Sequence, residues 1–413
     1  MSGARVVLCS VMVACGGRIV DTPPPPNAEA GLADVADANS DAPFTDATTE
    51  DAASPAPCSG APTVLFAPKQ VLTFSEIGIP QNLALVDVNG DGRLDIVMHE
   101  DSFPQNQETT LVFLQSSNGD FPAVSFSAAS SPSSWAAADV TGDGRADVVE
   151  TTDYVVVVRA GNVDGTLAAP KSYPMTPGAG LVVIGDFNGD HENDVVVQSN
   201  PCWGCSTSLL LFLQSGGALG SPVTTVTTST TAGVPGDVNG DGLLDMVGVA
   251  PGQSSSPLVV VPGAPGGTFG SAYSVPFEGQ ALSQGHVVAG DVTGDGKDDV
   301  VVVPDAYPSV LLVSTQKNGV LSAPAKYPSG EGASAVALGD VNGDCLTDVV
   351  VQHLGWYEVG VYLQQGGGTL APEVALQSVY GADVIAVGDV DGDGKNDIVT
   401  ADQQTLVIFR NTH

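Results

Sequence analysis

Basic residues are scarce in this chain of 413 residues. Only 12 Lys and Arg stand against 47 Asp and Glu, which gives a formal net charge of −35. Nucleic acids and anionic membrane surfaces attract positively charged proteins and repel negatively charged ones. The charge therefore argues against nucleic acid as a partner, and against membrane contact other than through a lipid anchor.

Sequence patterns of catalysis are also missing. The chain has no Gly-x-Ser-x-Gly elbow, no His-Glu-x-x-His and no phosphate-binding loop. The five histidines share no regular spacing: His99, His191, His286, His353 and His413. We therefore expect a protein that is not an enzyme.

Gly and Pro, by contrast, are abundant. The 50 Gly and 29 Pro make up about 19 per cent of the chain, against a usual share of about 12 per cent. Both are poor in helix interiors, which argues against a helical bundle. Apolar residues make up 43 per cent, much of it in Val-rich runs, so a β-rich core is expected rather than disorder throughout.

The first 62 residues are predicted to lie outside the folded domain. Residues 1–14 place the apolar run Val6 to Ala14 after Arg5, a pattern typical of an export signal and too short to span a bilayer. The junction Met12-Val13-Ala14-Cys15 resembles the lipobox of bacterial lipoproteins. We expect a lipid on Cys15 and a place at the cell surface or outer membrane; simple cleavage and secretion is the alternative. The acidic Ala- and Pro-rich residues 15–62 predict a disordered tether.

One nine-residue pattern occurs seven times in the rest of the chain. The first Asp residues of successive copies are 52, 47, 51, 54, 49 and 49 residues apart. Such a period indicates a repeat architecture. The copies are Asp87-Val-Asn-Gly-Asp-Gly-Arg-Leu-Asp95, Asp139-Val-Thr-Gly-Asp-Gly-Arg-Ala-Asp147, Asp186-Phe-Asn-Gly-Asp-His-Glu-Asn-Asp194, Asp237-Val-Asn-Gly-Asp-Gly-Leu-Leu-Asp245, Asp291-Val-Thr-Gly-Asp-Gly-Lys-Asp-Asp299, Asp340-Val-Asn-Gly-Asp-Cys-Leu-Thr-Asp348 and Asp389-Val-Asp-Gly-Asp-Gly-Lys-Asn-Asp397.

Short β-branched runs flank each copy, for example Leu83 to Val86 before the first and Ile96 to Met98 after it. Two more such runs follow in each repeat, and four antiparallel strands per repeat is the unit of a β-propeller blade. The last repeat stops after its third strand, while Phe66 to Phe74 matches a fourth strand. We therefore predict an all-β, seven-bladed propeller over residues 63–413, closed by the N-terminal strand in the last blade.

These residues resemble the FG-GAP repeats, also called VCBS repeats, which occur in integrin α-subunit heads and in bacterial surface proteins. The resemblance extends over residues 63–413. It implies the propeller fold and a calcium ion in each loop. It implies no particular ligand, because such propellers serve many functions.

The chemistry of the loops also favours calcium, which takes about six to eight oxygen ligands. Positions 1, 3, 5 and 9 of each copy offer side-chain oxygens, and Gly at position 6 permits the sharp turn, except where His191 and Cys345 replace it. A metal-free Asp-Gly turn is the alternative, but it would leave three like charges together in each loop. The predicted ligands are Asp87, Asn89, Asp91, Asp95, Asp139, Thr141, Asp143, Asp147, Asp186, Asn188, Asp190, Asp194, Asp237, Asn239, Asp241, Asp245, Asp291, Thr293, Asp295, Asp299, Asp340, Asn342, Asp344, Asp348, Asp389, Asp391, Asp393 and Asp397.

Four cysteines remain once the signal and the lipidated residue are set aside, and an even number in an exported chain favours disulfides. Cys202 and Cys205 lie between two strands of the third blade, where a local bridge is predicted; no zinc or redox partner is near in sequence. Cys58 and Cys345 are left. The predicted topology places them at the same face, where a bridge would fix the closing strand.

Two classes of function remain. The favoured class is a non-catalytic, monomeric module that binds a glycan or a protein; the alternative is an exported hydrolase that uses carboxylates near the propeller channel. Aromatic side chains are predicted in loops at the face opposite the calcium loops, beside a long insertion from His99 to Thr110. Such rings can hold a sugar or a peptide, or can merely cover the blade cores. The candidate ligand-binding residues are Trp135, Trp203, Trp356, Tyr307 and Tyr357.

Overall fold

The computed structural model describes residues 66–412 apart from 68, 74–77, 103–106, 118, 128–132, 153, 200–206, 227–232, 250–257, 276–284, 305–308, 355–356, 379–381, 383 and 403. The predicted signal, Cys15 and the tether lie outside these residues. So do six further residues with predicted roles: Cys58, Cys202, Trp203, Cys205, Tyr307 and Trp356. Among the described residues, no helix is long and apolar enough to cross a membrane.

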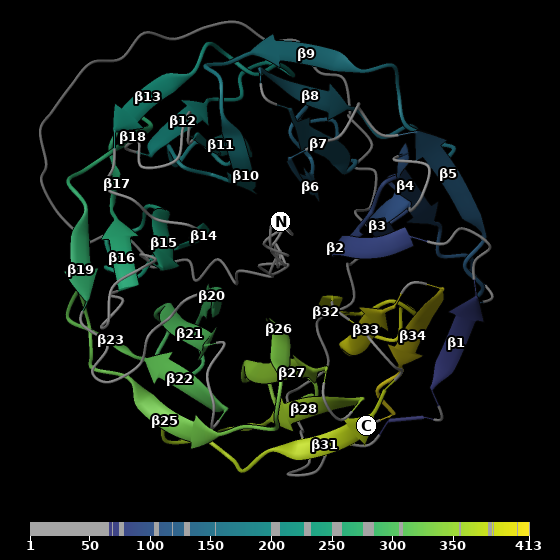
Figure 1. Ribbon diagram of the computed structural model, residues 1–413, viewed down its shortest axis with the longest axis vertical. Helices are drawn as coiled ribbons and strands as arrows, with labels where there is room; N and C mark the ends of the chain where they lie inside the picture. Colours follow the sequence, from purple (N-terminus) through teal and green to yellow (C-terminus); the bar gives the residue numbers. More distant parts are fainter. Residues whose placement is uncertain are drawn as a thin grey trace, which may run out of the picture. The chain divides into compact units, whose positions relative to one another are not determined.

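Seven antiparallel sheets of four strands form the blades of a propeller, as predicted (Figure 1). Blade 1 contains β2(Gly78–Val86), β3(Asp95–Ser102), β4(Gln107–Phe113) and β5(Ala123–Ser127). Blade 2 contains β6(Ser134–Ala138), β7(Asp147–Thr151), β8(Val155–Arg159) and β9(Lys171–Pro174). Blade 3 contains β10(Ala179–Gly185), β11(Asp194–Ser199), β12(Ser208–Phe212) and β13(Val223–Val226).

Blades 4 to 6 each add a two-stranded hairpin between the third and fourth strands. Blade 4 contains β14(Gly233–Gly236), β15(Asp245–Val249), β16(Leu258–Val261) and β19(Tyr273–Val275), with β17(Gly263–Ala264) and β18(Thr268–Phe269). Blade 5 contains β20(Gly285–Gly290), β21(Asp299–Pro304), β22(Val310–Ser314) and β25(Ala325–Pro328), with β23(Gln316–Lys317) and β24(Val320–Leu321). Blade 6 contains β26(Ala333–Gly339), β27(Asp348–His353), β28(Glu358–Tyr362) and β31(Val374–Gln377), with β29(Gln364–Gln365) and β30(Thr369–Leu370).

Blade 7 confirms the predicted closure of the ring. It contains β32(Val384–Gly388), β33(Asp397–Ala401) and β34(Thr405–Phe409), and its fourth strand is β1(Gln70–Thr73) from the other end of the chain. The register pairs Gln70 with Ile408 and Thr73 with Thr405. The first and last parts of the domain therefore complete one sheet between them, and the edge of β34 is paired.

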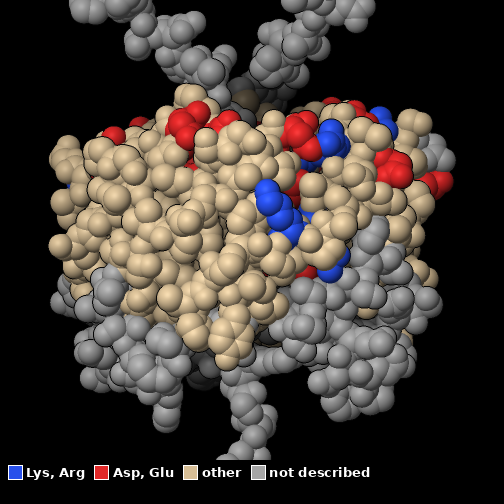
Figure 2. Space-filling view, turned by 90° about the horizontal axis from the view of Figure 1, so that it is seen from above, with Lys and Arg blue, Asp and Glu red and all other residues tan. Residues whose placement is uncertain are grey.

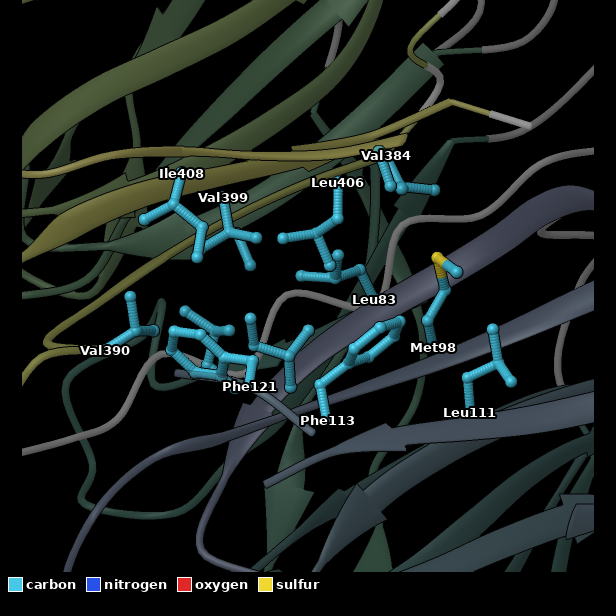
Figure 3. Packing of buried hydrophobic residues seen from close by; sticks show 14 residues of the cluster. Leu83, Met98, Leu111, Phe113, Phe121, Val384, Val390, Val399, Leu406 and Ile408 are labelled. Atoms are coloured by element: carbon cyan, nitrogen blue, oxygen red, sulfur yellow. The ribbon is translucent and has the colours of Figure 1, made fainter. Parts of the chain in front are cut away.

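The core lies between the blades, where the faces of neighbouring sheets pack together. The first strands β2, β6, β10, β14, β20, β26 and β32 contact one another in turn around the ring. Because both faces of the inner strands are covered, they carry continuous apolar runs instead of an alternating pattern; every residue of β27 is buried. Between blades 7 and 1, Leu83 and Met98 meet Val399 and Leu406 across the seam that closes the ring (Figure 3).

One predicted loop is instead part of the sheet. The stretch from His99 to Thr110 was expected to be an insertion at the ligand face. It extends β3 and β4, with His99 paired to Thr110 and Ser102 paired to Gln107. The sequence did not indicate this extension of the strands, because nearly all residues between His99 and Thr110 are polar.

Candidate metal centres

Each repeated motif forms a loop that joins the first strand of a blade to the second, as predicted. We number the loops 1 to 7 along the chain and their residues by position 1 to 9. In loop 1, Asp87 at position 1 accepts the N–H of Gly90 on Oδ1 and that of Gly92 on Oδ2, both at 2.7 Å. This pair of bonds recurs in all seven loops at 2.6–2.9 Å. The side chain at position 1 therefore fixes the shape of each loop from its own backbone.

The residues at positions 4 and 6 have positive φ angles in every loop, which explains why Gly is frequent there. His191 and Cys345 adopt the same backbone at position 6, with φ of 69° and 64°. Their N–H groups still bond the position-1 Asp, at 2.9 Å and 2.6 Å. Loops 3 and 6 therefore keep the common shape at the cost of backbone strain.

The Asp at position 9 joins its loop to the third strand of the same blade, a role that the sequence did not predict. Its Oδ1 accepts the N–H of a residue just beyond the third strand, Gln115 for Asp95, and the equivalent bond occurs in all seven blades at 2.8–3.0 Å. All seven are fully buried: Asp95, Asp147, Asp194, Asp245, Asp299, Asp348 and Asp397. In loops 4 and 5, Oδ2 of Asp245 and of Asp299 is buried without a hydrogen bond.

Burial raises the pKa of these position-9 carboxyl groups, against the opposing effect of the backbone N–H groups that they accept. The pKa rises to about 6 for Asp95, Asp147, Asp194, Asp245 and Asp299. It rises to about 7 for Asp348 and Asp397. The carboxylates at positions 1 and 5 add a smaller repulsion, so each loop gathers negative charge that favours a bound cation or proton.

The donor set of the loops fits a hard cation. In loop 7, one carboxylate oxygen from each of Asp389, Asp391 and Asp397 lies within 4.8 Å of the others. One ion bound at about 2.3–2.6 Å from each oxygen can bridge such a group. The other loops replace the Asp at position 3 by Asn or Thr, which still supply an oxygen. Two buried carboxylate oxygens without partners, in loops 4 and 5, fit the same role.

Basic side chains partly neutralise three of the loops. Arg93 pairs with Asp91 in loop 1 and Arg145 pairs with Asp143 in loop 2. Lys395 lies 3.3 Å from Asp393 in loop 7. In loops 3, 4 and 6, position 7 is Glu192, Leu243 or Leu346, which carry no positive charge. Figure 2 shows carboxylates along one edge of the described part of the molecule, with basic side chains there and further down the side.

In five blades, the residue that follows the third strand also contacts the loop of the preceding blade. Gln115, which follows β4 in blade 1, donates from Nε2 to the backbone oxygen of Val390 in loop 7 at 2.6 Å, and Asn411 donates to the backbone oxygen of Val341 in loop 6 at 3.0 Å. A Cβ on the position-4 Gly of loops 2, 4 and 5 would stand 2.7–2.9 Å from an amide nitrogen at the equivalent place in the next blade, on Gln214, Gln316 or Gln364. The sequence does carry a pattern that could have predicted this contact, because Gln recurs after the third strand in four repeats.

Of the five predicted ligand-binding aromatic residues, the structure describes Trp135 and Tyr357. Trp135 was expected at the ligand face, but it is only 3 per cent exposed and packs in the core beside His99, with ring centroids 6.0 Å apart. Its position within β6 explains this burial. Tyr357 is 40 per cent exposed, before β28. Cys345 is disulfide-bonded, and its pairing with Cys58 stays a prediction because Cys58 lies outside the described residues.

The fold and these loops define a repeat propeller with acidic loops. The sequence matches the FG-GAP-like repeat family over residues 87–150, 237–302, 291–351 and 340–400, together more than half of the chain. The chain belongs to this family. No curated protein sequence matches it.

Solved structures share the fold at low sequence identity. A chain of the crystal structure of BBS1N in complex with ARL6DN, soaked with lead, has a TM-score of 0.56 and 12% identity, covering 85% of this chain and 97% of that chain. An Agrocybe aegerita lectin, whose structure concerns specific recognition of non-reducing terminal N-acetylglucosamine, has a TM-score of 0.50 and 16% identity, covering 78% of this chain and 85% of that chain. At these identities the likeness concerns the fold alone.

Proposed function

We propose that this protein is an exported, non-catalytic binding module whose propeller is stabilised by calcium in its seven loops. The observation that carries the proposal is the repetition of one loop geometry in every blade, with side-chain oxygens at positions 1, 3, 5 and 9 around one turn. Loop 7 supports it most directly, because its three carboxylates converge. The bound ion supplies positive charge to oxygens that otherwise repel one another, and it also ties the first strand of a blade to the second.

Calcium stoichiometry tests this part of the proposal. Equilibrium dialysis of the full chain against about 2 mM calcium should give several ions per chain, with seven as the upper limit set by the loops. Replacing Asp389, Asp391 and Asp397 together by Asn should lower the count by one. Asp164→Asn, at an exposed turn in blade 2, is the matched control and should leave the count unchanged. A chain that binds no calcium at this concentration would refute the proposal.

The ligand in this proposal is a glycan or a protein bound by loops at the face opposite the calcium loops. The exposed ring of Tyr357 supports it, and the sequence places Trp356 next to it and Trp203 in the corresponding connection of blade 3. A propeller of similar fold recognises a terminal sugar in the fungal lectin, so glycans are the class to screen first. Trp356→Ala and Tyr357→Ala should abolish binding of a ligand found on a glycan array while the melting temperature stays within a few degrees. Unchanged binding in both variants would move the site elsewhere.

Display at the cell surface rests on the N-terminal sequence. The apolar run before Cys15 and the acidic tether after it suit an anchor followed by a spacer. Mass spectrometry of the mature N-terminal peptide should find a lipid on Cys15, and Cys15→Ser should release the protein into the medium. An unmodified Cys15 in the mature protein would favour plain secretion.

A further inference from the structure

Blade 6 lacks one core side chain that blades 3 and 5 have. Gly360 on β28 pairs with Val351. The residues in the same register in blades 3 and 5 are Leu210 and Leu312, both fully buried. The strand interior is a poor place for Gly, which weakens the strand and leaves nothing to pack. A separate reason must therefore account for it.

The space above Gly360 is filled by a His–Glu pair. A Cβ on Gly360 would stand 1.8 Å from Oε1 of Glu373 and 2.8 Å from Nε2 of His353. These two atoms lie 2.5 Å apart, and His353 is 1 per cent exposed. The N–H of Gly330 donates to Oε2 of Glu373 at 2.9 Å, which fixes the carboxylate from a second side. Blade 6 therefore replaces an aliphatic contact by a partly buried, oriented carboxylate, which packing alone does not require.

The ionised state of this carboxylate is maintained by its partners. Burial alone would raise the pKa of Glu373, but the hydrogen bond and charge of His353 and the N–H of Gly330 outweigh it, so the pKa lies below its ordinary value. Nδ1 of His353 is buried without a hydrogen-bond partner. Unpaired buried polar atoms of this kind are costly, and they are more frequent at functional sites than in ordinary core.

Glu373 lies in the wall of a pocket between blades 5 and 6. The pocket has a volume of about 360 Å³, and its wall includes Tyr327, Pro328, Gly330, Tyr362, Pro372 and Glu373. The hydroxyl of Tyr362 donates to the backbone oxygen of Pro328 at 2.9 Å, so a hydrogen bond between lining residues joins the two blades. Glu373 is the one charged residue in this lining. The pocket thus presents a single carboxylate among aromatic and proline rings.

The junction between blades 2 and 3 gives an internal comparison. There Tyr173 accepts the N–H of Leu219 at 3.3 Å, as Tyr327 accepts that of Leu370 at 3.4 Å. Both junctions therefore contain the same hydrogen bond from a Leu N–H to a Tyr hydroxyl. The polar residues are not shared, because the same register holds Phe212, Ser199 and Pro222 in place of Tyr362, His353 and Glu373.

We propose that the pocket between blades 5 and 6 binds a primary ammonium group, such as that of a lysine side chain or an amino sugar. A carboxylate in a largely apolar wall favours a cationic partner, and aromatic rings suit the carbon skeleton that carries it. Glu373 already has His353, Gly330 and Tyr362 as partners, and an ammonium would donate to the carboxylate lone pairs that these leave. The net charge of −35 also attracts cations to the molecule. His353 acts as a positioning residue that orients the carboxylate. None of these residues belongs to a calcium loop, so this site is independent of the proposed function.

Titration of the full chain with small probes tests the site. The probes are Nα-acetyl-lysine methylamide and glucosamine, with Nα-acetyl-norleucine methylamide and N-acetylglucosamine as neutral counterparts. By isothermal calorimetry, at least one ammonium probe should bind, and its neutral counterpart should bind roughly tenfold more weakly or not at all. The preferred probe distinguishes a peptide source from a sugar source. Absence of binding by both ammonium probes, or equal binding of the neutral probes, would overturn the proposal.

Two substitutions connect binding to this pocket. Glu373→Gln keeps the shape and should weaken the ammonium probe roughly tenfold or more, while Glu331→Gln, an exposed carboxylate in the same segment, should not. Gly360→Ala should also weaken binding, because the new Cβ displaces Glu373. Melting temperatures establish that the variants are folded. Wild-type affinity in Glu373→Gln would overturn the proposal. Repeating the titration without calcium separates its failure from failure of the calcium sites.

Discussion

The side-chain amide of Gln115 donates a hydrogen bond of 2.6 Å to the backbone oxygen of Val390, 275 residues further along the chain. The same residue gives its backbone N–H to Asp95 in its own blade, at 2.8 Å. Gln115 therefore links two consecutive acidic loops across the seam that closes the ring. A change in one loop is expected to reach its neighbour through this residue.

Loss of the Gln115 side chain should destabilise the closed ring. Gln115→Ala leaves the Val390 oxygen buried without its donor, which costs about 1–3 kcal/mol. The melting temperature should fall accordingly, by a few degrees. Gln404→Ala, at an exposed turn of blade 7, removes a similar side chain and should have no measurable effect. Equal melting temperatures for Gln115→Ala and the wild type would show that the link is unimportant.

Backbone strain at position 6 gives a pair of opposite predictions. His191→Gly relieves a φ of 69° and should stabilise the metal-free chain, whereas Gly92→Ala imposes that strain at a φ of 81° and should destabilise it. A Cβ on Gly92 meets nothing within 4 Å, so its effect is that of the backbone alone. Each change should be about 1 kcal/mol in the free energy of unfolding. Denaturant unfolding measures both, and a destabilising His191→Gly would contradict the account.

Much of the fold was readable because one local pattern recurs. The motif Asp87 to Asp95 fixes a loop through bonds to its own backbone, and the β-branched runs on either side of it predicted the flanking strands. The role of Asp95 as a buried brace could not be predicted, since its partner Gln115 follows a separate strand. Trp135 was misplaced for a similar reason: its burial depends on the neighbouring blade, which sequence near Trp135 does not describe. The pair of His353 and Glu373 could not be predicted, because the equivalent positions in blade 3 hold Ser199 and Pro222.

Because β1 completes the last blade, removal of N-terminal residues should be tolerated only up to the start of β1. A chain that starts at residue 63 keeps β1 and should melt like the full chain. A chain that starts at residue 77 loses β1, exposes the edge of β34, and should melt at a much lower temperature or aggregate. Thermal melts by circular dichroism distinguish the two. Similar melting of both chains would show that β1 contributes little to closure.

The stability of the metal-free protein should depend on pH in an unusual direction. Burial raises the pKa of Asp348 to about 7 in the folded chain, whereas an unfolded Asp titrates near about 3.9. Between these two pKa values the folded state therefore binds more protons than the unfolded state. The stabilisation that Asp348 contributes in the folded chain is accordingly lost as pH rises from about 4 to 7. Calcium competes with these protons, so the stabilisation by calcium should be larger at pH 7.5 than at pH 5. Asp348→Asn should reduce this difference, while a pH-independent gain from calcium would contradict it.

We propose that calcium in the loops stabilises the propeller, and thermal melting with and without calcium tests this proposal most directly. Extracellular calcium modules bind at roughly 10⁻⁴ to 10⁻³ M, so seven sites at about 2 mM calcium would contribute roughly 5 to 12 kcal/mol. The melting temperature of the dialysed chain should rise by on the order of 10 °C on addition of calcium and fall again with chelator. Identical melting curves in calcium and in chelator would contradict the account.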